Sequence, residues 1–228
     1  MKLQTLRRGT AAGAVIALSL TFAACGSEDD NEATGSDTPS AAENGGDNSG
    51  DEATGAQAQT FGAGCAAIPT DPNDAGSFEG MVQDPVATAA SNNPVLKTLV
   101  AAVSSVDGLV DTLNDQPALT VFAPIDDPAF AAIPKDTLNS LVEGAQKDGM
   151  DSDLAKVLAN HVLAENDDPA AVVGEKETLA GGTLTIEGDE NGMTVSDGTV
   201  TANVLCGNIP TANATVYVID QVLTGILG

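Results

Sequence analysis

Apolar residues recur at a helical period in the middle of the chain. The first such run comprises Val95, Leu96, Leu99, Val100 and Val103. Steps of three and four residues place these side chains on one face of an α-helix. The preceding Asn93-Pro94 pair supplies a capping residue and a residue suited to the first turn, so we expect a helix to begin there.

Three further helices are expected on the same grounds. Their apolar positions are Val106, Leu109, Val110 and Leu113 in the second, Leu138, Leu141 and Val142 in the third, and Leu154, Val157 and Leu158 in the fourth. Gly108 marks the break between the first two helices, and Asp151 or Ser152 begins the fourth.

A two-residue alternation replaces the helical period toward the C-terminus. Residues 183–187 alternate between apolar and polar, a turn-rich stretch follows at 188–192, and residues 193–195 form the returning strand. We expect further strands at 199–205 and 215–219, and an earlier one at 119–122. Helices in front of a meander, with neither a parallel βαβ succession nor an internal repeat, indicate an α+β fold.

The N-terminus has the pattern of a targeting segment. Lys2, Arg7 and Arg8 form a basic start, and residues 11–24 are almost wholly apolar. The run is too short for a transmembrane helix, which needs about 20 apolar residues. We therefore predict that residues 1–24 are a cleaved signal peptide.

The apolar run stops at Cys25, in the sequence Phe22-Ala23-Ala24-Cys25. This resembles the lipobox of bacterial lipoproteins, with Phe22 in place of the usual aliphatic residue. The resemblance implies that the Cys25 thiol receives a diacylglycerol, whose two chains hold a protein durably at a membrane. It implies an extracytoplasmic protein anchored to the outer face of the cell membrane, with partial release possible. The alternative is an ordinary secretory signal with an incidental cysteine.

Residues 26–60 contain no aromatic side chain and no aliphatic one larger than alanine. Such a segment cannot bury enough apolar surface to offset its conformational entropy. We therefore expect Cys25 and the residues up to 60 to form a disordered acidic tether, and residues 61–228 to form one domain.

Charge excludes one class of partner. The chain has 8 Lys and Arg against 33 Asp and Glu, a net charge of −25. Loss of three basic residues with the signal peptide leaves 5 − 33 = −28. Nucleic acid is therefore excluded, because phosphate binding needs clustered Lys and Arg. No metal or cofactor is expected either: the loop-like stretch 71–76 lacks a calcium ligand at its fifth position and has Val82 where glutamate is needed.

Two cysteines remain after Cys25, namely Cys65 and Cys206. Their spacing matches neither a zinc set nor a redox Cys-x-x-Cys motif, and an exported protein meets an oxidising compartment. We predict a disulfide between them. Two buried free thiols are the alternative.

The stretch from Thr120 to Phe130 resembles the first signature of the fasciclin domain. Residues 158–163 are similar to that family's helix-to-strand step, and residues 215–223 to its closing strand. The resemblance covers the chain from about residue 80 onward. Residues 80–94 and 211–215 are further similar to mycobacterial fasciclin-domain surface antigens, which implies an actinobacterial protein whose helices pack on an antiparallel wedge or sandwich.

The signature residues carried over are Thr120, Val121, Phe122, Ala123, Pro124, Asp126, Phe130, His161, Val218, Ile219 and Asp220. All are expected to be structural. Pro124 should stop strand pairing, and Asp126 or Asp127 should cap a helix that begins at Pro128. The resemblance implies that His161 is buried where a helix meets a strand.

No catalytic residue is expected. His161 is the only histidine and has no motif partner, and no Gly-x-Ser-x-Gly elbow is present. Two acidic pairs, at 126–127 and 167–168, suit turns better than a glycosidase site. Asn160 replaces the tyrosine that most fasciclin domains carry before the histidine. In animal members this region is linked to integrin-mediated adhesion, so the resemblance does not carry that activity to this chain.

We therefore predict a noncatalytic, lipid-anchored adhesion or binding module for protein or carbohydrate partners in the envelope or on a host. One alternative is an enzyme or small-ligand carrier on the same scaffold, which a deep apolar pocket with convergent polar groups would favour. The other is a structural component of the envelope.

Overall fold

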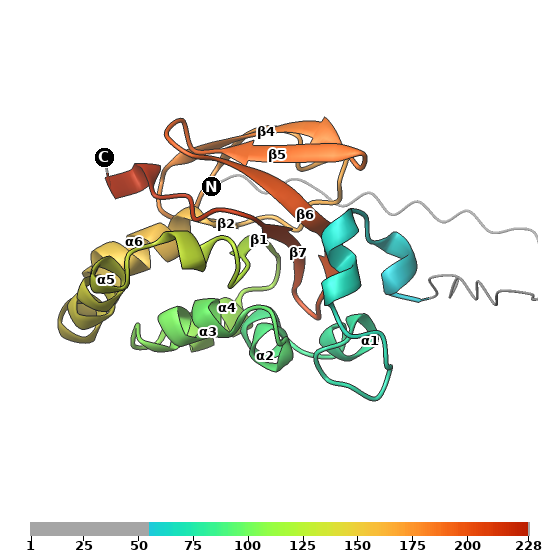
Figure 1. Cartoon of the computed structure of the whole chain (residues 1–228), viewed down its shortest axis with the longest axis horizontal. Helices are drawn as coiled ribbons and strands as arrows, with labels where there is room; N and C mark the ends of the chain where they lie inside the picture. The colour runs from blue at the N-terminus through green and yellow to red at the C-terminus, as the bar shows by residue number, and fades with distance from the viewer. Residues whose placement is uncertain (1–54, 228) are drawn as a thin grey trace, which may run out of the picture. The chain divides into compact units, whose positions relative to one another are not determined.

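The computed structural model describes residues 55–227. The predicted signal peptide, Cys25 and the tether up to residue 54 lie outside the described residues. In Figure 1, helices α2 (Val86–Asn92), α3 (Lys97–Ser104) and α4 (Leu109–Asp115) form a layer below the sheet. Strands β4 (Thr183–Asp189) and β5 (Gly192–Ser196) lie at the top, at the part of the sheet farthest from these helices.

The sheet has seven strands in the order β2-β1-β7-β6-β5-β4-β3. The strands not yet given are β1 (Leu119–Pro124), β2 (Val162–Leu163), β3 (Gly174–Glu177), β6 (Thr201–Pro210) and β7 (Ala214–Ile219). The α+β class is thus as the sequence predicted. One pairing differs from the antiparallel expectation, because β1 and β7 run parallel. Helices α5 (Lys135–Asp148) and α6 (Asp153–Asn160) lie in the long connection between these strands and allow the chain to return in the same direction.

Strand β7 is buried on both faces, so it separates two apolar clusters. Val216 and Val218 belong to the helix-side cluster, which fills the space between the sheet and the helices. Tyr217 and Ile219 belong to the wedge cluster, which also contains Leu184 and other residues of β4 and β5. A strand covered on both faces is a nearly continuous apolar run in sequence, as residues 214–219 are apart from Thr215.

The wedge arises at β6, the longest strand. Its register against β7 shifts between Val204 and Cys206 and again between Cys206 and Ile209. Within the second shift, Asn208 has a φ of 59°. Such irregularities bend and twist a strand. The bend lets β6 pair with β7 along one part and with β5 along the other, so that the β3–β5 end folds over the β1–β7 face.

The expected helices are present with altered ends. The first begins at Lys97 and not at the Asn93-Pro94 pair, where the Asn93 side chain instead accepts a hydrogen bond from the Val95 N–H at 3.1 Å. Gly108 precedes α4 with a φ of 78°, consistent with the predicted break. Ser152 caps α6 by accepting the Ala155 N–H at 3.2 Å. Two short helices, α1 (Phe78–Met81) and α2, and the strand β3 had no counterpart in the sequence prediction.

The last residues of the predicted tether are ordered, contrary to expectation. Residues 57–59 form a short 3-10 helix, and Ala56 is buried while its N–H donates to the Glu79 carboxylate. The Asn208 amide donates to the Gln59 carbonyl at 2.9 Å. Most of these contacts are made by backbone groups. The tether is predicted from amino-acid composition, which carries no information about backbone hydrogen bonds. The folded region therefore begins by residue 55 and not at 61.

Candidate functional site

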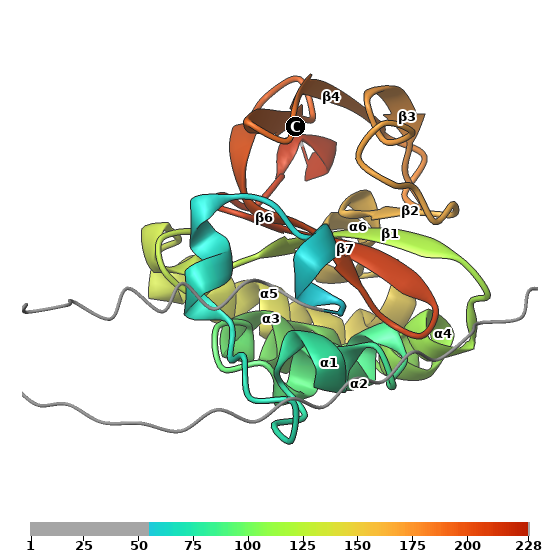
Figure 2. The same ribbon diagram turned by 90° about the vertical axis from the view of Figure 1, so that its right-hand side faces the viewer.

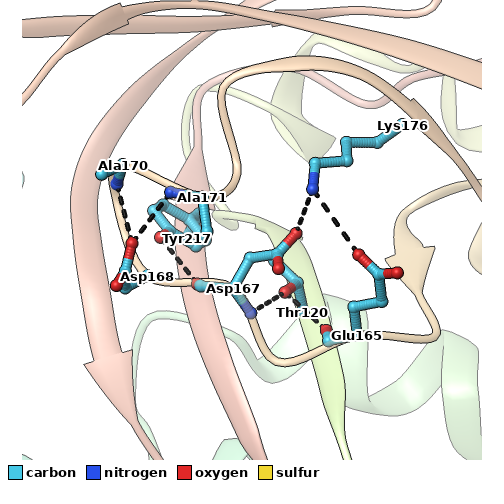
Figure 3. A network of polar contacts seen from close by, with 8 residues as sticks. All are labelled: Thr120, Glu165, Asp167, Asp168, Ala170, Ala171, Lys176 and Tyr217. Atoms are coloured by element: carbon cyan, nitrogen blue, oxygen red, sulfur yellow. Dashed lines mark hydrogen bonds and ion pairs between the residues drawn. The ribbon is translucent and has the colours of Figure 1, made fainter.

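The signature residue Thr120 organises the loop that follows β2. Its hydroxyl donates to the Glu165 carbonyl at 2.7 Å and accepts the Asp167 N–H at 2.9 Å (Figure 3). The Tyr217 hydroxyl donates to the Asp167 carbonyl at 3.1 Å. Burial, followed by the nearby Asp168 and Asp167 carboxylates, raises the pKa of Tyr217, so the phenol stays protonated and keeps this bond.

The carboxylates of Asp167 and Asp168 in this loop both have partners within the domain. The Lys176 ammonium lies 2.8 Å from an Asp167 carboxylate oxygen and 3.6 Å from Glu165, as Figure 3 shows. The hydrogen bond to Asp167 is the main cause of a raised pKa of Lys176. Asp168 accepts the N–H groups of Ala170 and Ala171 at 2.9 and 2.8 Å, which is turn chemistry. These contacts give both acids structural roles.

Asp126 caps a different helix from the one expected. Its carboxylate accepts the Lys97 N–H at 3.2 Å and the Thr98 N–H at 2.7 Å, at the start of α3. The short helix after Pro128 spans residues 130–132 and has no side-chain cap. The sequence argument identified the chemistry correctly but assigned it to the nearest helix along the chain, whereas the fold brings α3 to Asp126.

His161 lies at the junction of α6 and β2 and is buried. Its Nδ1 is 2.7 Å from the Val157 carbonyl, and its Nε2 accepts the Leu223 N–H at 2.9 Å. This pattern requires the proton on Nδ1. Burial lowers the pKa of His161 to about 4, so the ring is neutral at pH 7. Both nitrogens are engaged by the backbone, which leaves neither free for acid-base chemistry.

The remaining signature residues are buried or join strands. Strand β1 ends at Pro124, as expected. The Asp220 carboxylate accepts the backbone and side-chain N–H groups of Asn203, both at 2.7 Å, and so joins the end of β7 to β6. The buried signature side chains are Phe122, Ala123, Phe130, Val218 and Ile219, while Val121 is half-buried.

A disulfide joins Cys65 to Cys206, as the sequence predicted. The two residues are 141 positions apart. Cys65 lies in the short helix Ala63–Ala67, which packs beside β6 (Figure 2). The bond therefore attaches the beginning of the domain to its longest strand.

An apolar cavity of about 430 Å³ lies on the helix side of the sheet. Its walls come from α2, α3, α4, α6 and β1, through residues such as Ala90, Val103, Leu109, Leu158 and Val121. His161 also borders it. The sequence analysis did not locate this cavity. The available signal was the alanines at 87, 90 and 159, which leave space where α2 and α6 face it.

The rim of the cavity is apolar in part. Four large apolar side chains among residues 55–227 are well exposed, and two of them, Met150 at 51% and Leu179 at 45%, line this cavity. Ser91, Ser104 and Thr112 add exposed hydroxyl groups. Among the described residues that line the cavity, none is Asp, Glu, Lys or Arg.

Residues 55–227 hold neither a metal-binding cluster nor a membrane-spanning helix. In that range, no three His, Cys, Asp or Glu side chains are grouped to hold a metal ion. The loop weighed as a calcium site is an exposed turn, in which hydrogen bonds from the Asn73 backbone and side chain lower the pKa of Asp71. The helices of this part of the chain are all too short or too polar to cross a membrane.

The fold and its signature define a fasciclin-type domain. The family model described as "Fasciclin domain" matches residues 94–225. The immunogenic protein MPB70 of Mycobacterium bovis is 45% identical over 170 residues, which cover 71% of this chain and 80% of the relative. The cell surface glycolipoprotein MPB83 of the same species is 42% identical over 171 residues, 73% of this chain and 72% of the relative. The chain belongs to the fasciclin-domain family.

A solved structure is also similar. It is a FAS1 domain pair from the insect cell adhesion molecule Fasciclin I, at 19% identity and a TM-score of 0.44, over 57% of this chain and 45% of that one. The resemblance to mycobacterial fasciclin-domain antigens, predicted from the sequence, is therefore confirmed by the relatives.

Proposed function

We propose that this chain is a lipid-anchored protein of the cell surface that displays its fasciclin domain as a noncatalytic binding module. Its partner would be a protein or carbohydrate of the envelope or of a host. The observation that carries the proposal is the 42% identity, over 171 residues, to a protein named a cell surface glycolipoprotein. The apolar run that ends at Cys25 supplies the matching attachment point.

The polar geometry of the domain supports a noncatalytic role. Catalysis by acid-base chemistry needs a titratable group that can reach a substrate. His161 has both ring nitrogens bonded to the backbone, the Asp167 carboxylate is paired with Lys176 of β3, and Asp168 is bonded within its own loop. These groups hold the fold together and are not presented to a ligand.

The binding surface for a macromolecular partner would lie away from Asn160. That side chain is buried, and its carbonyl oxygen accepts the Thr178 hydroxyl at 3.2 Å. A partner therefore cannot contact it without disrupting the domain.

Anchoring is tested by detergent phase partitioning of the wild-type chain and the Cys25→Ala variant. We expect the wild type to enter the detergent phase, and the variant to remain in the aqueous phase with an intact domain. Equal partitioning of both proteins would contradict the proposal.

The binding role is tested with the immobilised Cys25→Ala chain, exposed separately to envelope fractions and to host matrix components. We expect saturable retention of one component. The control is the same chain after reduction and unfolding. Failure of the folded chain to retain anything above this control would exclude the binding role.

A further inference from the structure

The helix-side cavity has the size of a ligand pocket and opens to solvent at its rim. Protein interiors are packed about as densely as organic crystals and hold few voids larger than a water molecule. The cavity has about 430 Å³, which falls within the range of ligand pockets. An apolar cavity of about 150 Å³ holds one benzene molecule, so this volume has room for roughly seventeen carbon atoms.

The side chains that line the cavity favour a hydrocarbon ligand. Its buried members include Val86, Leu99, Leu109, Leu113 and Leu158. His161 adds no free polar group, because both of its nitrogens are already bonded to the backbone. A ligand would gain by transferring apolar surface from water into this space, and would find no deep hydrogen-bonding partner to fix a polar group.

The charges select a neutral head group. The described residues include all five lysines of the mature chain, and none of them lines the cavity. A carboxylate would therefore meet no cation there and would approach a chain with a net charge of −25. Ser91, Ser104 and Thr112 line the cavity at exposed positions. The Ser91 and Thr112 hydroxyls donate to the Thr88 and Gly108 carbonyls at 2.6 and 2.8 Å and are left as acceptors, which suits an alcohol head group.

We propose that the helix-side cavity binds one hydrocarbon chain of a neutral membrane lipid. The chain lies among the aliphatic side chains of α2, α3, α4 and α6, and its head group stays at the rim. Exposed Met150 and Leu179 extend the apolar surface outward, where a chain that leaves a bilayer would first make contact. The membrane as the source of the lipid rests on the proposed anchoring, whereas the choice of a hydrocarbon chain rests on the cavity.

The test uses purified Cys25→Ala chain and titration calorimetry with straight-chain 1-alkanols of six to ten carbons. We expect saturable one-to-one binding that strengthens about fourfold with each added methylene group. 1-Decanol should bind at least tenfold more tightly than decanoate at neutral pH. Absence of saturable binding would overturn the site, and equal or tighter binding of decanoate would overturn the neutral head group.

Cavity-filling variants locate the site. Ala90→Phe on α2 and Ala159→Phe on α6 place a ring in the cavity and should weaken 1-decanol binding at least tenfold. Ala101→Phe on α3 is the matched control, because Ala101 is exposed and does not line the cavity. Unchanged binding by both filled variants would overturn the assignment. If either variant fails to fold by circular dichroism, crosslinking of the unaltered cavity with a diazirine-bearing decanol decides, and labels confined to peptides outside the cavity walls would refute the site.

The lipid source is tested on wild-type chain purified from membranes. We expect a neutral lipid to copurify and to be displaced by 1-decanol. A different outcome would be that no lipid copurifies and that the wild type fails to bind 1-decanol although Cys25→Ala binds it. The cavity would then hold the acyl chains of the protein's own anchor, and the membrane would be the wrong source of the bound lipid. If Cys25→Ala binds 1-decanol but the wild type does not partition into detergent, the cavity assignment stands and the proposed anchoring fails.

Discussion

The two faces of strands β1 and β7 bury apolar side chains to different effect. On the wedge side, the rings of Phe122 and Tyr217 pack with centroids 5.6 Å apart, and the Phe61 ring meets Tyr217 edge-on at 6.4 Å. On the helix side, an open volume of about 430 Å³ remains. One sheet thus supports a filled core and a hollow one. Burial alone does not specify dense packing, because the sizes and shapes of the facing side chains decide it.

The difference follows from which residues face each side. Large side chains such as Tyr217, Ile186 and Met193 interdigitate within the wedge and are almost completely buried. The cavity walls combine leucines and valines with small residues such as Ala90 and Ala159, on helices of seven or eight residues. The small residues leave space that the larger side chains around them do not fill.

The largest expected loss of stability comes from truncating a large side chain on the densely packed wedge side. Tyr217→Ala should lower the free energy of unfolding by about 3–5 kcal/mol, because it creates a cavity among packed side chains and removes the bond to Asp167. Val103→Ala should cost less than about 1 kcal/mol, since that half-buried residue already borders open space. Urea unfolding of both variants measures this. Similar losses would show that the two sides are packed alike.

His161 gives the next largest effect, and it depends on pH. Its pKa is about 4 in the folded chain against an ordinary value of 6.5, so the unfolded chain binds more protons. The contribution is complete above about pH 6.5 and is lost as the pH falls toward 4. Between pH 7 and 5 the wild type should lose about 2 kcal/mol more than His161→Gln.

The measurement pairs urea unfolding at several pH values with an NMR titration of the imidazole. Only one histidine is present in the chain, so its ring signal is unambiguous. A midpoint near 6.5 in the folded protein would contradict the burial of this ring beside the cavity.

Asp126 contributes to the stability of α3, which forms one wall of the cavity. Asp126→Ala removes the acceptor for the Lys97 and Thr98 N–H groups at the start of α3 and should cost about 1 kcal/mol. Asp126→Asn should restore most of the loss, because an amide oxygen still accepts. In the Asp126→Ala variant, amide hydrogens in the first turn of α3 should exchange faster than in the wild type. Unchanged exchange there would contradict the cap.

The smallest change is expected from filling the hollow side. Ala159→Leu places its added atoms in the cavity and should leave the free energy of unfolding unchanged or raise it by up to about 1 kcal/mol. Ala155→Leu, one turn earlier on α6, adds the same atoms to a closely packed position and should cost about 1–3 kcal/mol. Thermal unfolding compares the pair. Equal destabilisation would show that the cavity does not accept a side chain.

The sequence predicted most elements whose apolar pattern is strong. The strand expected at residues 215–219 is β7, which is buried on both faces, and the spacing in 154–158 corresponds to α6. It did not predict β3, because Gly174-Glu175-Lys176-Glu177 is an edge strand held by backbone pairing and carries no apolar alternation. The sequence also did not predict the parallel pairing of β1 with β7, because a local pattern does not say which distant strand will be the neighbour.

The site was predictable to a smaller extent. Chemistry could be assigned to His161 and Asp126 from their types and surroundings, but the partner of Asp126 could not, because α3 approaches it only in the folded chain. The cavity was not visible in advance. It consists of the space between five elements, and a sequence records the atoms that are present without recording the gaps that their arrangement leaves.

The attachment of residues 55–65 to β6 determines how the domain responds to a mechanical pull from its N-terminal side. Phe61 pairs with Gly207, and the next tie along the chain is the covalent bond between Cys65 and Cys206. Tension that arrives along the preceding residues is transferred there to β6, and bypasses the helices and strands enclosed between the two cysteines. A pull between residue 55 and the C-terminus would therefore leave residues 66–205, which supply the cavity walls, unstretched.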